Sequence, residues 1–438
     1  MSHSYHTVII MKHLSTSIKT LFVLLGFAAA WFPAAAKTHY VGGDISLLPE
    51  YEEAGAVYKD HEGKPIAEVL PWFRSQGMNA MRVRLFVNPD RYKELHQNDT
   101  NADTRYDPNA CQDMEYILPL CKRIVDAGFD LMLDFHYSDT WADPAKQWTP
   151  VDWQDLTQSR QLEIIYEYTY SSLTTLKEAG VVPAFIQTGN EISYGMMWGE
   201  AGTKNPLKVY TSSSANWVRF VKLFNNAAKA CREVCPEAKI ICHTERVANP
   251  GYLKDFYAKM DSMGADYDII GLSYYPYFHG DLTTLDTALS TLEENFPGRD
   301  IMIVETGYSY KWAVPGTNHD YQSQWAYSDA GQDKFARELV ATLEAHPACT
   351  GLFWWWMEYN AFGTSLSGWY NAALFDSTTG RATSALKTIC TFADADSGIT
   401  APDAEAYDEI WYDLSGRRTS PSENRGLKIG RKGKFIRK

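Results

Sequence analysis

Residues 301–308 read Ile301-Met302-Ile303-Val304-Glu305-Thr306-Gly307-Tyr308, four apolar side chains followed directly by a carboxylate. Because the run has no polar alternation, it predicts a strand covered on both faces, as in a parallel sheet between helices. A charged side chain at the end of such a buried strand costs free energy unless it is paired with an opposite charge or serves a function. Glu305 is therefore the first candidate functional residue.

Similar runs recur between residues 38 and 393 and alternate with amphipathic stretches of helical period. The expected strands are Tyr40–Ser46, Ala80–Val87, Asp130–Tyr137, Ala184–Glu191, Lys239–Glu245, Asp268–Pro276, Ile301–Tyr308 and Cys349–Met357. The expected helices lie near Pro65–Gln76, Asp113–Ala127, Asp155–Ala179, Ser214–Val234, Gly251–Met263, Leu282–Asn295, Gln332–His346 and Ala382–Phe392. Eight strand–helix units predict an α/β fold, a (β/α)8 TIM barrel that occupies residues 37–393.

Polar residues gather where the expected strands end, and Glu191 ends the fourth strand as Glu305 ends the seventh. In a parallel barrel the carboxyl ends of all strands emerge on one face, so these two side chains are expected to meet. Glycoside hydrolysis needs two carboxyl groups across the scissile bond, which act as acid/base and nucleophile in a retaining enzyme. Either carboxylate alone could equally be structural, but the pair in matching contexts favours catalysis.

The N-terminal residues differ from the barrel in composition. Lys19 precedes the apolar run Leu21–Ala30, and Ala34-Ala35-Ala36 resembles a small-residue cleavage site. Residues 1–36 are therefore predicted to be a cleavable signal peptide, and the protein is expected to be secreted to the periplasm, the cell surface or the medium.

The C-terminal residues also differ from the barrel in composition. Residues 394–410 are acidic with small residues and are predicted to be a linker, whereas residues 411–438 form a short basic tail. The tail could be a sorting or small β segment, or a solvated disordered tail.

The chain has 438 residues, a formal net charge of −13 and 14% aromatic residues. Nucleic-acid binding needs clustered Lys and Arg, so the acidic balance argues against nucleic acid and against a polyanionic substrate, and leaves a neutral polysaccharide. No segment approaches about 18 continuous apolar residues, so no membrane span is expected. The chain is expected to act as a monomer without a cofactor.

Seven cysteines are an odd number for an exported chain. Cys231, Cys235 and Cys242 lie close together in sequence, but there is no C-x-x-C pair and no histidine at ligand spacing from them. Buried or disulfide-linked thiols are therefore favoured over a zinc site, and no metal is predicted.

Several segments carry a family resemblance: Gly42–Ser46, Asn79–Pro89, Gln187–Glu191, Ser273–Pro276 and, most diagnostic, Asp134-Phe135-His136-Tyr137-Ser138-Asp139-Thr140-Trp141-Ala142-Asp143-Pro144. In this order, over roughly residues 40–392, they resemble the arabinogalactan endo-β-1,4-galactanases of glycoside hydrolase family 53, in clan A. Asn190-Glu191 alone would be a weak signal, but the ordered set is a strong one.

The resemblance implies a retaining endo-hydrolase of β-1,4-galactan, the polymer of type I arabinogalactan and of pectic galactan side chains. Glu191 would be the acid/base with a raised pKa, and Glu305 the ionised nucleophile. Arg82 would hold Glu305 ionised, with Arg84 as the rival for this role, and Tyr275 could donate a hydrogen bond to Glu305. The residues expected to bind substrate are Asn190, Arg82, Arg84, His136, Asp139, Trp141, Tyr275, Trp355 and Asp44.

The resemblance also implies that Asn190 binds the 2-hydroxyl of the reacting sugar and that Trp355 forms an aromatic platform. The chain departs from the family here, because it has Trp354-Trp355-Trp356 where Tyr-Trp-Glu is common. The acidic, calcium-binding stretch that bacterial relatives often carry after strand seven is also missing: Lys311–Asp320 offers only Asn318, His319 and Asp320, so no calcium site is predicted.

Two alternatives remain open. Another clan A β-glycanase, of the mannanase or cellulase type, would share the same carboxylates, and only the segment Asp134–Pro144 favours a galactanase over it. A non-catalytic glycan-binding barrel would be expected to have lost one carboxylate, and both are present.

Overall fold

The computed structural model describes residues 37–365 apart from 205 and 210–213, residues 372–393, and the backbone of four short strands between 411 and 437. The chain divides into two compact units, Met1–Asp396 and Ser397–Lys438. The predicted signal peptide, residues 1–36, and the predicted linker, residues 394–410, lie outside the described residues.

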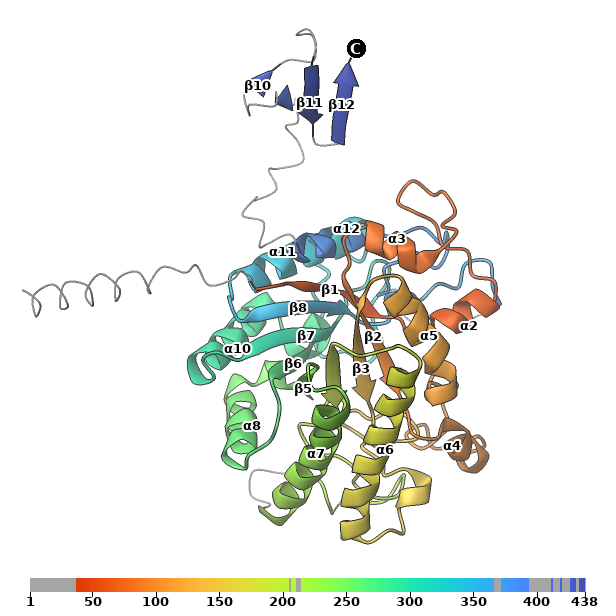
Figure 1. Ribbon diagram of the computed structural model, residues 1–438, viewed down its shortest axis with the longest axis vertical. Coiled ribbons are helices and arrows are strands. Elements are labelled where there is room, and N and C mark those ends of the chain that lie inside the picture. Colours follow the sequence, from red (N-terminus) through yellow and green to blue (C-terminus); the bar gives the residue numbers. More distant parts are fainter. Residues whose placement is uncertain are drawn as a thin grey trace, which may run out of the picture. The chain divides into compact units, whose positions relative to one another are not determined.

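Eight parallel strands form a closed barrel in sequence order, and β8 pairs with β1. The strands are β1 Tyr40–Asp44, β2 Ala80–Leu85, β3 Asp130–Phe135, β4 Phe185–Thr188, β5 Lys239–Thr244, β6 Ile269–Tyr274, β7 Asp300–Thr306 and β8 Cys349–Trp354. Helices surround this barrel (Figure 1). The prediction of a (β/α)8 TIM barrel is confirmed.

The helices that the sequence predicted follow the expected order, and α6 and α7 pack side by side (Figure 1). They are α3 Val69–Ser75, α5 Met114–Asp126, α6 Gln158–Glu178, α7 Ser214–Val234, α8 Pro250–Ser262, α10 Leu282–Asn295, α11 Asp329–Glu344 and α12 Ser384–Cys390. Short elements in the loops were not predicted: α2 Leu48–Glu53, α4 Pro89–His96, α9 Pro276–His279, and the 3₁₀ turns η1 Val151–Trp153 and η2 Arg246–Ala248.

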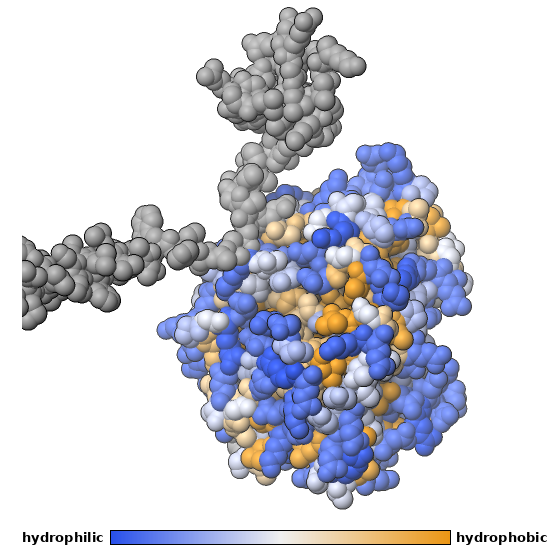
Figure 2. Space-filling model, in the orientation of Figure 1, coloured by the Kyte–Doolittle hydropathy of each residue, from blue (hydrophilic) through white to orange (hydrophobic). Residues whose placement is uncertain are grey.

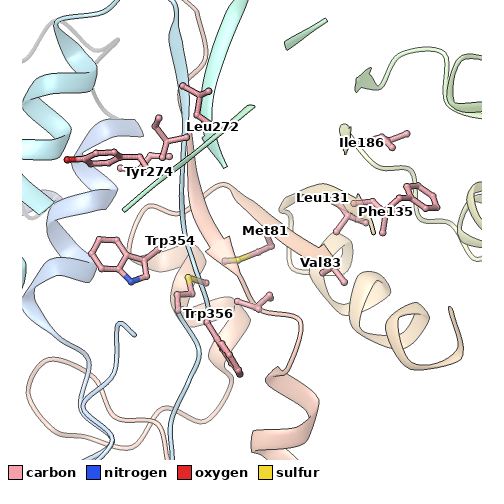
Figure 3. Packing of buried hydrophobic residues seen from close by; sticks show 14 of the residues in the cluster. Met81, Val83, Leu131, Phe135, Ile186, Leu272, Tyr274, Trp354 and Trp356 are labelled. Carbon is pink, nitrogen blue, oxygen red and sulfur yellow. The ribbon is translucent and has the colours of Figure 1, made fainter. Parts of the chain in front are cut away.

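Hydrophobic side chains alternate between the two faces of the barrel strands. Met81 and Val83 of β2 belong to the outer core, where the strands pack against the helices (Figure 3). A second, smaller cluster collects residues from seven strands and so fills the barrel interior: Ala80, Met132, Phe185, Ile241, Ile269, Met302, Val304 and Phe353. A strand alternates with period two, so residues two and four positions further along also point inward.

At those later inward positions the side chains are polar. Two residues beyond the inner cluster stand Arg82 on β2, Asp134 on β3, Gln187 on β4 and His243 on β5, and Ser273 stands four beyond on β6. All of them are fully buried. The barrel interior is therefore apolar toward the amino ends of the strands and polar toward their carboxyl ends, where the functional face of this fold lies.

Replacing Phe353, which is fully buried in the inner cluster, with alanine is expected to lower the free energy of unfolding by about 3–5 kcal/mol. The closed barrel cannot collapse onto the cavity, so both the transfer term and the cavity term are lost. Urea unfolding measures the effect. Val182→Ala, at a side chain that is 49% exposed, is the control and should change stability little; equal effects of both substitutions would contradict the packing assignment.

All seven cysteines lie in the described part of the chain and are free thiols, and all but Cys111 are buried. The alternative of disulfide-linked cysteines is therefore not realised in this structure. Burial raises the pKa of the Cys121 thiol and of the Cys231 thiol, which keeps both groups neutral and unreactive at ordinary pH.

The second unit contains a small antiparallel sheet with the strand order β10-β9-β11-β12. Its strands are β9 Trp411–Tyr412, β10 Arg418–Thr419, β11 Gly426–Gly430 and β12 Gly433–Arg437. On the barrel unit, the face drawn in Figure 2 is mostly hydrophilic with smaller hydrophobic patches. Among the described residues, no helix has both the length and the apolar composition needed to span a membrane.

Candidate active site

A cleft of about 710 Å³ opens where the barrel strands end, a size typical of ligand-binding sites. Glu191, which follows β4, and Glu305, near the end of β7, both line it. The other lining residues are Trp141, Ala142, Asp143, Pro144, Asn190, Glu245, Arg246, Ala248, Asn249, Tyr275, Tyr277, Phe278, His279, Gly307, Val314, Asn318, Trp355 and Ala372. The two carboxylates that the sequence singled out therefore share one cleft.

Glu305 is held by a hydrogen bond at each carboxylate oxygen. Arg82 Nη2 donates to Oε1 at 2.8 Å, and the Tyr275 hydroxyl donates to Oε2 at 3.0 Å. The neighbouring Tyr274 points into the outer core, where its hydroxyl donates to the Gly280 carbonyl at 3.1 Å. Arg82 and Tyr275 thus lie where the resemblance implied, and their two bonds fix the direction of the Glu305 carboxylate.

The fully buried guanidinium of Arg82 joins five side chains from different strands and loops. Its hydrogen bonds, all between 2.7 and 2.9 Å, go to Gln187 Oε1, Asp44 Oδ2, Asp134 Oδ2, Asn190 Oδ1 and Glu305 Oε1. A planar guanidinium has five N–H donors and can bond to several acceptors at once. A lysine in place of Arg82 could not make this set of bonds. Asp44 therefore acts through Arg82 beneath the cleft rather than as part of its lining.

Glu191 sits on a sharp turn after β4. Its φ is 47° and that of Gly189 is 112°, so both residues adopt left-handed conformations. For a glutamate this costs about 1–3 kcal/mol, and such strain is concentrated at functional sites. The turn is fixed by Gln147, whose side-chain amide donates to the Asn190 carbonyl at 2.7 Å. The result is a half-buried Glu191 side chain on the wall of the cleft.

The two carboxyl groups have different electrostatic surroundings. Burial raises the pKa of Glu191 well above its usual value, and the Glu305 and Glu245 carboxylates raise it further. Burial also raises the pKa of Glu305, to about 7, but there the adjacent Arg82 acts in the opposite direction. Because the cation stands beside Glu305 and not beside Glu191, Glu305 loses its proton first. The arrangement can therefore present one carboxylate and one carboxylic acid to the same bound molecule.

Aromatic rings form another part of the cleft wall. Trp141 and Trp355 both line it, with ring centroids 6.0 Å apart in an edge-to-face arrangement. Trp354 and Trp356, which flank Trp355, are buried in the outer core (Figure 3). The structure therefore singles out Trp355 from the three consecutive tryptophans as the one that faces the cleft.

Arg84 does not compete with Arg82 for Glu305. Its closest carboxylate oxygen is Asp44 Oδ1 at 3.6 Å, and its guanidinium lies 4.7 Å from the ring centroid of Trp141 and 4.8 Å from that of Trp355. Of the two rivals for keeping Glu305 ionised, Arg82 takes that role and Arg84 does not. Arg84 supports the two cleft-lining indole rings from behind, because a guanidinium stacks well on aromatic faces.

Besides Asp44, Arg82 and Arg84, two further residues that were expected to bind substrate, His136 and Asp139, lie outside the cleft lining. The His136 ring is buried, with Nε2 3.1 Å from Asp134 Oδ2, and its Nδ1 accepts the Ala142 backbone N–H at 3.1 Å. The Asp139 carboxylate accepts the backbone N–H groups of Asn88 at 2.9 Å and Val151 at 2.7 Å. The expectation of direct substrate contact is therefore corrected: both side chains fix the loops that carry the cleft.

Sequence reasoning missed Glu245, which lines the cleft directly after β5. Its Oε1 accepts a hydrogen bond from the Ser193 hydroxyl at 2.6 Å, and burial raises its pKa to about 7. Its place in the sequence could have revealed it as a site residue, because Glu245 ends the expected fifth strand just as Glu191 and Glu305 end theirs.

Within the part of the chain that the structure describes, no group of three or more His, Cys, Asp or Glu side chains is arranged to hold a metal ion. The carboxylates of the cleft are instead distributed around its wall and paired with protein donors.

Comparison with known protein families shows which family the chain belongs to. The family model for glycosyl hydrolase family 53 matches residues 40–389, which is nearly the whole barrel. The chain belongs to this family. It is therefore a glycoside hydrolase, and membership of the family implies a polysaccharide substrate.

Individual relatives agree with this assignment. The chain is 31% identical over 364 residues to a probable arabinogalactan endo-β-1,4-galactanase A of Neosartorya fischeri, an alignment that covers 79% of this chain and 91% of the relative. It is also 31% identical over 324 residues to an uncharacterized protein in the bgaB 5′ region of Niallia circulans, covering 72% of this chain and 82% of that protein. The family 53 barrel of this chain is thus shared over most of its length with both.

Among solved structures, the family 53 catalytic domain of Ignisphaera aggregans superposes with a TM-score of 0.67 at 28% identity, covering 82% of this chain and 97% of that domain. A fungal β-1,4-galactanase superposes with a TM-score of 0.65 at 26% identity, covering 80% of this chain and 99% of the fungal chain.

Proposed function

We propose that the protein is a retaining endo-hydrolase of β-1,4-galactan, with Glu191 as acid/base and Glu305 as nucleophile. The observation that carries this proposal is the unequal pairing of two carboxyl groups on one cleft, since Arg82 is bonded to Glu305 and not to Glu191. Double displacement by two carboxyl groups requires this difference, one group neutral and one ionised at the start of the reaction.

In the first step, the Glu305 carboxylate attacks the anomeric carbon while the bond to the leaving sugar breaks, and Glu191 gives its proton to the departing oxygen. In the second step, the Glu191 carboxylate takes a proton from water, which attacks the same carbon and releases Glu305. Asn190 is proposed to bind the 2-hydroxyl, because its amide nitrogen uses one hydrogen on the Ala142 carbonyl at 2.8 Å and retains the other for a ligand.

The choice of galactan rests on similarity and on the cleft's composition. Relatives about 30% identical are named arabinogalactan endo-β-1,4-galactanases. The cleft-lining rings of Trp141 and Trp355 offer apolar surface for the C–H face of a pyranose. Among the described residues that line the cleft there is one arginine and no lysine. This suits a neutral sugar chain better than a polyanionic one.

Digestion of pectic galactan, mannan and carboxymethylcellulose, followed by sizing of the products, tests the proposal. We expect galacto-oligosaccharides of several lengths from galactan and no products from the other two polymers. Cleavage of mannan or carboxymethylcellulose instead would favour another clan A specificity, and release of a single short product would contradict endo action.

Glu245→Gln is expected to move the basic limb of the kcat/KM–pH profile to lower pH. The Glu245 carboxylate raises the pKa of Glu191, so removing its charge makes the Glu191 acid ionise earlier. Glutamine keeps an acceptor for the Ser193 hydroxyl, and Glu237→Gln, at an exposed site, is the control. A basic limb that stays in place or moves to higher pH would show that Glu245 does not act on Glu191.

We also propose that the protein is exported by cleavage of residues 1–36. The apolar run Leu21–Ala30 followed by Ala34-Ala35-Ala36 supports this. Cell fractionation with N-terminal sequencing is expected to find a mature chain that begins at Lys37. An intact N-terminus in the cytoplasmic fraction would contradict it.

A further inference from the structure

One wall of the cleft carries polar side chains that the proposed reaction steps do not use. Arg246 of η2, Asn249 directly after η2, and His279 of α9 all line the cleft. Because η2 packs against α9, the residues that follow β5 and β6 form one continuous surface here. These three residues, together with Glu245 directly before η2, are called the polar wall.

The order of the strands places the polar wall opposite the indole rings. Glu191 follows β4 and Glu305 lies on β7, and in the closed barrel β5 and β6 separate these two strands on one side. β8, β1, β2 and β3 separate them on the other side. Trp141 follows β3 and Trp355 follows β8, so the rings and the polar wall face each other across the two carboxyl groups.

The polar wall begins beside the proposed acid, Glu191. Directly after Glu191 the chain runs along the end of β5, where the backbone N–H of Ile192 donates to the His243 carbonyl at 2.9 Å. The Ser193 hydroxyl then donates to Glu245 Oε1 at 2.6 Å. Hydrogen bonds from two successive residues therefore fix the segment after Glu191 against the strand that leads into the polar wall.

The sugar that leaves in the first step is directed toward this wall. Asn190 Nδ2 donates at 2.8 Å to the carbonyl of the residue after Trp141, so a reacting sugar whose 2-hydroxyl binds Asn190 lies on the side of the indole rings. In a double displacement the leaving oxygen departs from the face opposite the nucleophile Glu305, beside the acid. The leaving sugar thus extends from Glu191 away from the rings.

Two residues of the polar wall have hydrogen-bond donors to spare. Asn249 Oδ1 accepts the Tyr252 backbone N–H at 3.0 Å, which leaves both hydrogens of its amide nitrogen. His279 Nδ1 accepts the Tyr275 backbone N–H at 3.0 Å, so the hydrogen of the neutral ring is on Nε2. Burial lowers the pKa of His279 to about 4, and Arg246 lowers it further, which keeps the ring neutral. Neither nitrogen donates to another side chain or carbonyl in the part of the chain that the structure describes.

The polar wall also has an acceptor to spare. Glu245 Oε2 is buried and has no hydrogen-bond partner among the described residues, since the Ser193 hydroxyl bonds to Oε1. Such an atom costs free energy that a hydroxyl group of a ligand would offset. The Arg246 guanidinium is held by stacking, 4.5 Å from the ring centroid of Tyr252 and 4.9 Å from that of Tyr194, and its Nε has no described partner either.

We propose that the polar wall is the subsite for the sugar that leaves in the first step, with Glu245 accepting and Asn249 and His279 donating hydrogen bonds to its hydroxyl groups. This inference rests on the proposed function. A neutral pyranose suits the wall, because a hydroxyl group both donates and accepts. In the second step a sugar on this wall can replace water: its hydroxyl oxygen bonds to the anomeric carbon, its proton passes to Glu191, and the bond to Glu305 breaks.

The test compares galactan, whose leaving group is a sugar chain, with an aryl β-galactobioside, whose leaving group has no sugar hydroxyls. Asn249→Ser keeps an oxygen that can cap α8 but removes the amide donors, and His279→Asn keeps an acceptor for the Tyr275 N–H but removes Nε2. Each variant is expected to lower kcat/KM on galactan roughly 3- to 10-fold, the usual effect of one lost hydrogen bond, and to change it less than about twofold on the aryl substrate. Asn295→Ser, at an exposed site on α10, is the control and should change neither.

Losses of equal size on both substrates would mean that the two side chains only support the shape of the cleft, and no loss on galactan would mean that they do not bind the leaving sugar. Either result would overturn the inference. When galactobiose is added to the aryl substrate, the wild-type protein is expected to form galactotetraose by transfer, and both variants less of it relative to hydrolysis. Absence of transfer, or equal transfer by the variants, would also overturn the inference. A wild-type protein that cleaves neither galactan nor the aryl substrate would instead refute the proposed function.

Discussion

Glu305→Ala is expected to lower kcat on galactan by several orders of magnitude while the barrel remains folded. The substitution removes the group proposed to form the covalent intermediate, so the remaining route has no nucleophile on that face of the sugar. It also relieves the crowding of carboxylates around Arg82, which still has Asp44 and Asp134 as partners. Reducing-end assays on galactan measure the activity, and circular dichroism checks the fold.

Added azide should restore part of the Glu305→Ala activity, because a small anion can occupy the space of the lost carboxylate. The azide would attack from the face that Glu305 used, so the product is expected to be a glycosyl azide of inverted configuration. Glu237→Ala, which removes an exposed carboxylate outside the cleft, should leave activity unchanged and should not respond to azide. Near-normal turnover of Glu305→Ala would end the assignment of Glu305 as nucleophile.

All eight strands of the barrel could be predicted because short stretches rich in apolar residues alternate with amphipathic stretches of helical period, whereas the ends of the strands could not. β4 was expected to reach Glu191 but ends at Thr188, since Gly189 and Glu191 turn left-handed. β8 was expected to reach Met357 but ends at Trp354, and Trp356 has a φ of 49°. Turns of this kind depend on contacts from distant loops, such as that of Gln147 with Asn190, which the local sequence does not reveal.

Some residues of the candidate site could likewise be predicted from the sequence, and others could not. Glu191 and Glu305 could be found because strand ends of a barrel converge on one face, and the same rule would have found Glu245. Arg82 and Arg84 share strand parity, so only the three-dimensional distances show that Arg82 alone reaches Glu305. The hydrogen bonds that join Gln187, His243 and Ser273 could not be predicted, because contacts across a barrel link residues of no fixed sequence spacing.

Glu191→Ala is expected to lower kcat on galactan by about 10²–10⁴-fold, the usual contribution of general acid–base catalysis. The loss should be much smaller in the first step for a substrate with a good leaving group, since that group departs without a proton. The second step still needs a base, so a glycosyl-enzyme on Glu305 should accumulate and give a burst of the leaving group. Stopped-flow release of an aryl leaving group, with mass spectrometry of the trapped protein, measures both effects.

The stability of the Glu191→Ala variant should also show that Glu191 serves catalysis rather than folding. The folded-state pKa of Glu191 is raised above its usual value of 4.5, so the carboxyl group increasingly penalises the folded state as pH rises above that value. Removing it is therefore expected to leave the melting temperature at mildly alkaline pH unchanged or higher, as for a group retained for function rather than for stability. A strongly destabilised variant would show that Glu191 is a structural carboxylate.

Azide distinguishes the two carboxylates most sharply. In Glu191→Ala the anion should attack the intermediate on Glu305 from the side of the missing acid/base, which gives a glycosyl azide of retained configuration. The two variants are thus expected to yield opposite anomers from one substrate, because the two carboxyl groups act on opposite faces of the same sugar. An inverted azide from Glu191→Ala and a retained one from Glu305→Ala would exchange the two roles, and the unequal surroundings that Arg82 creates would then need another explanation.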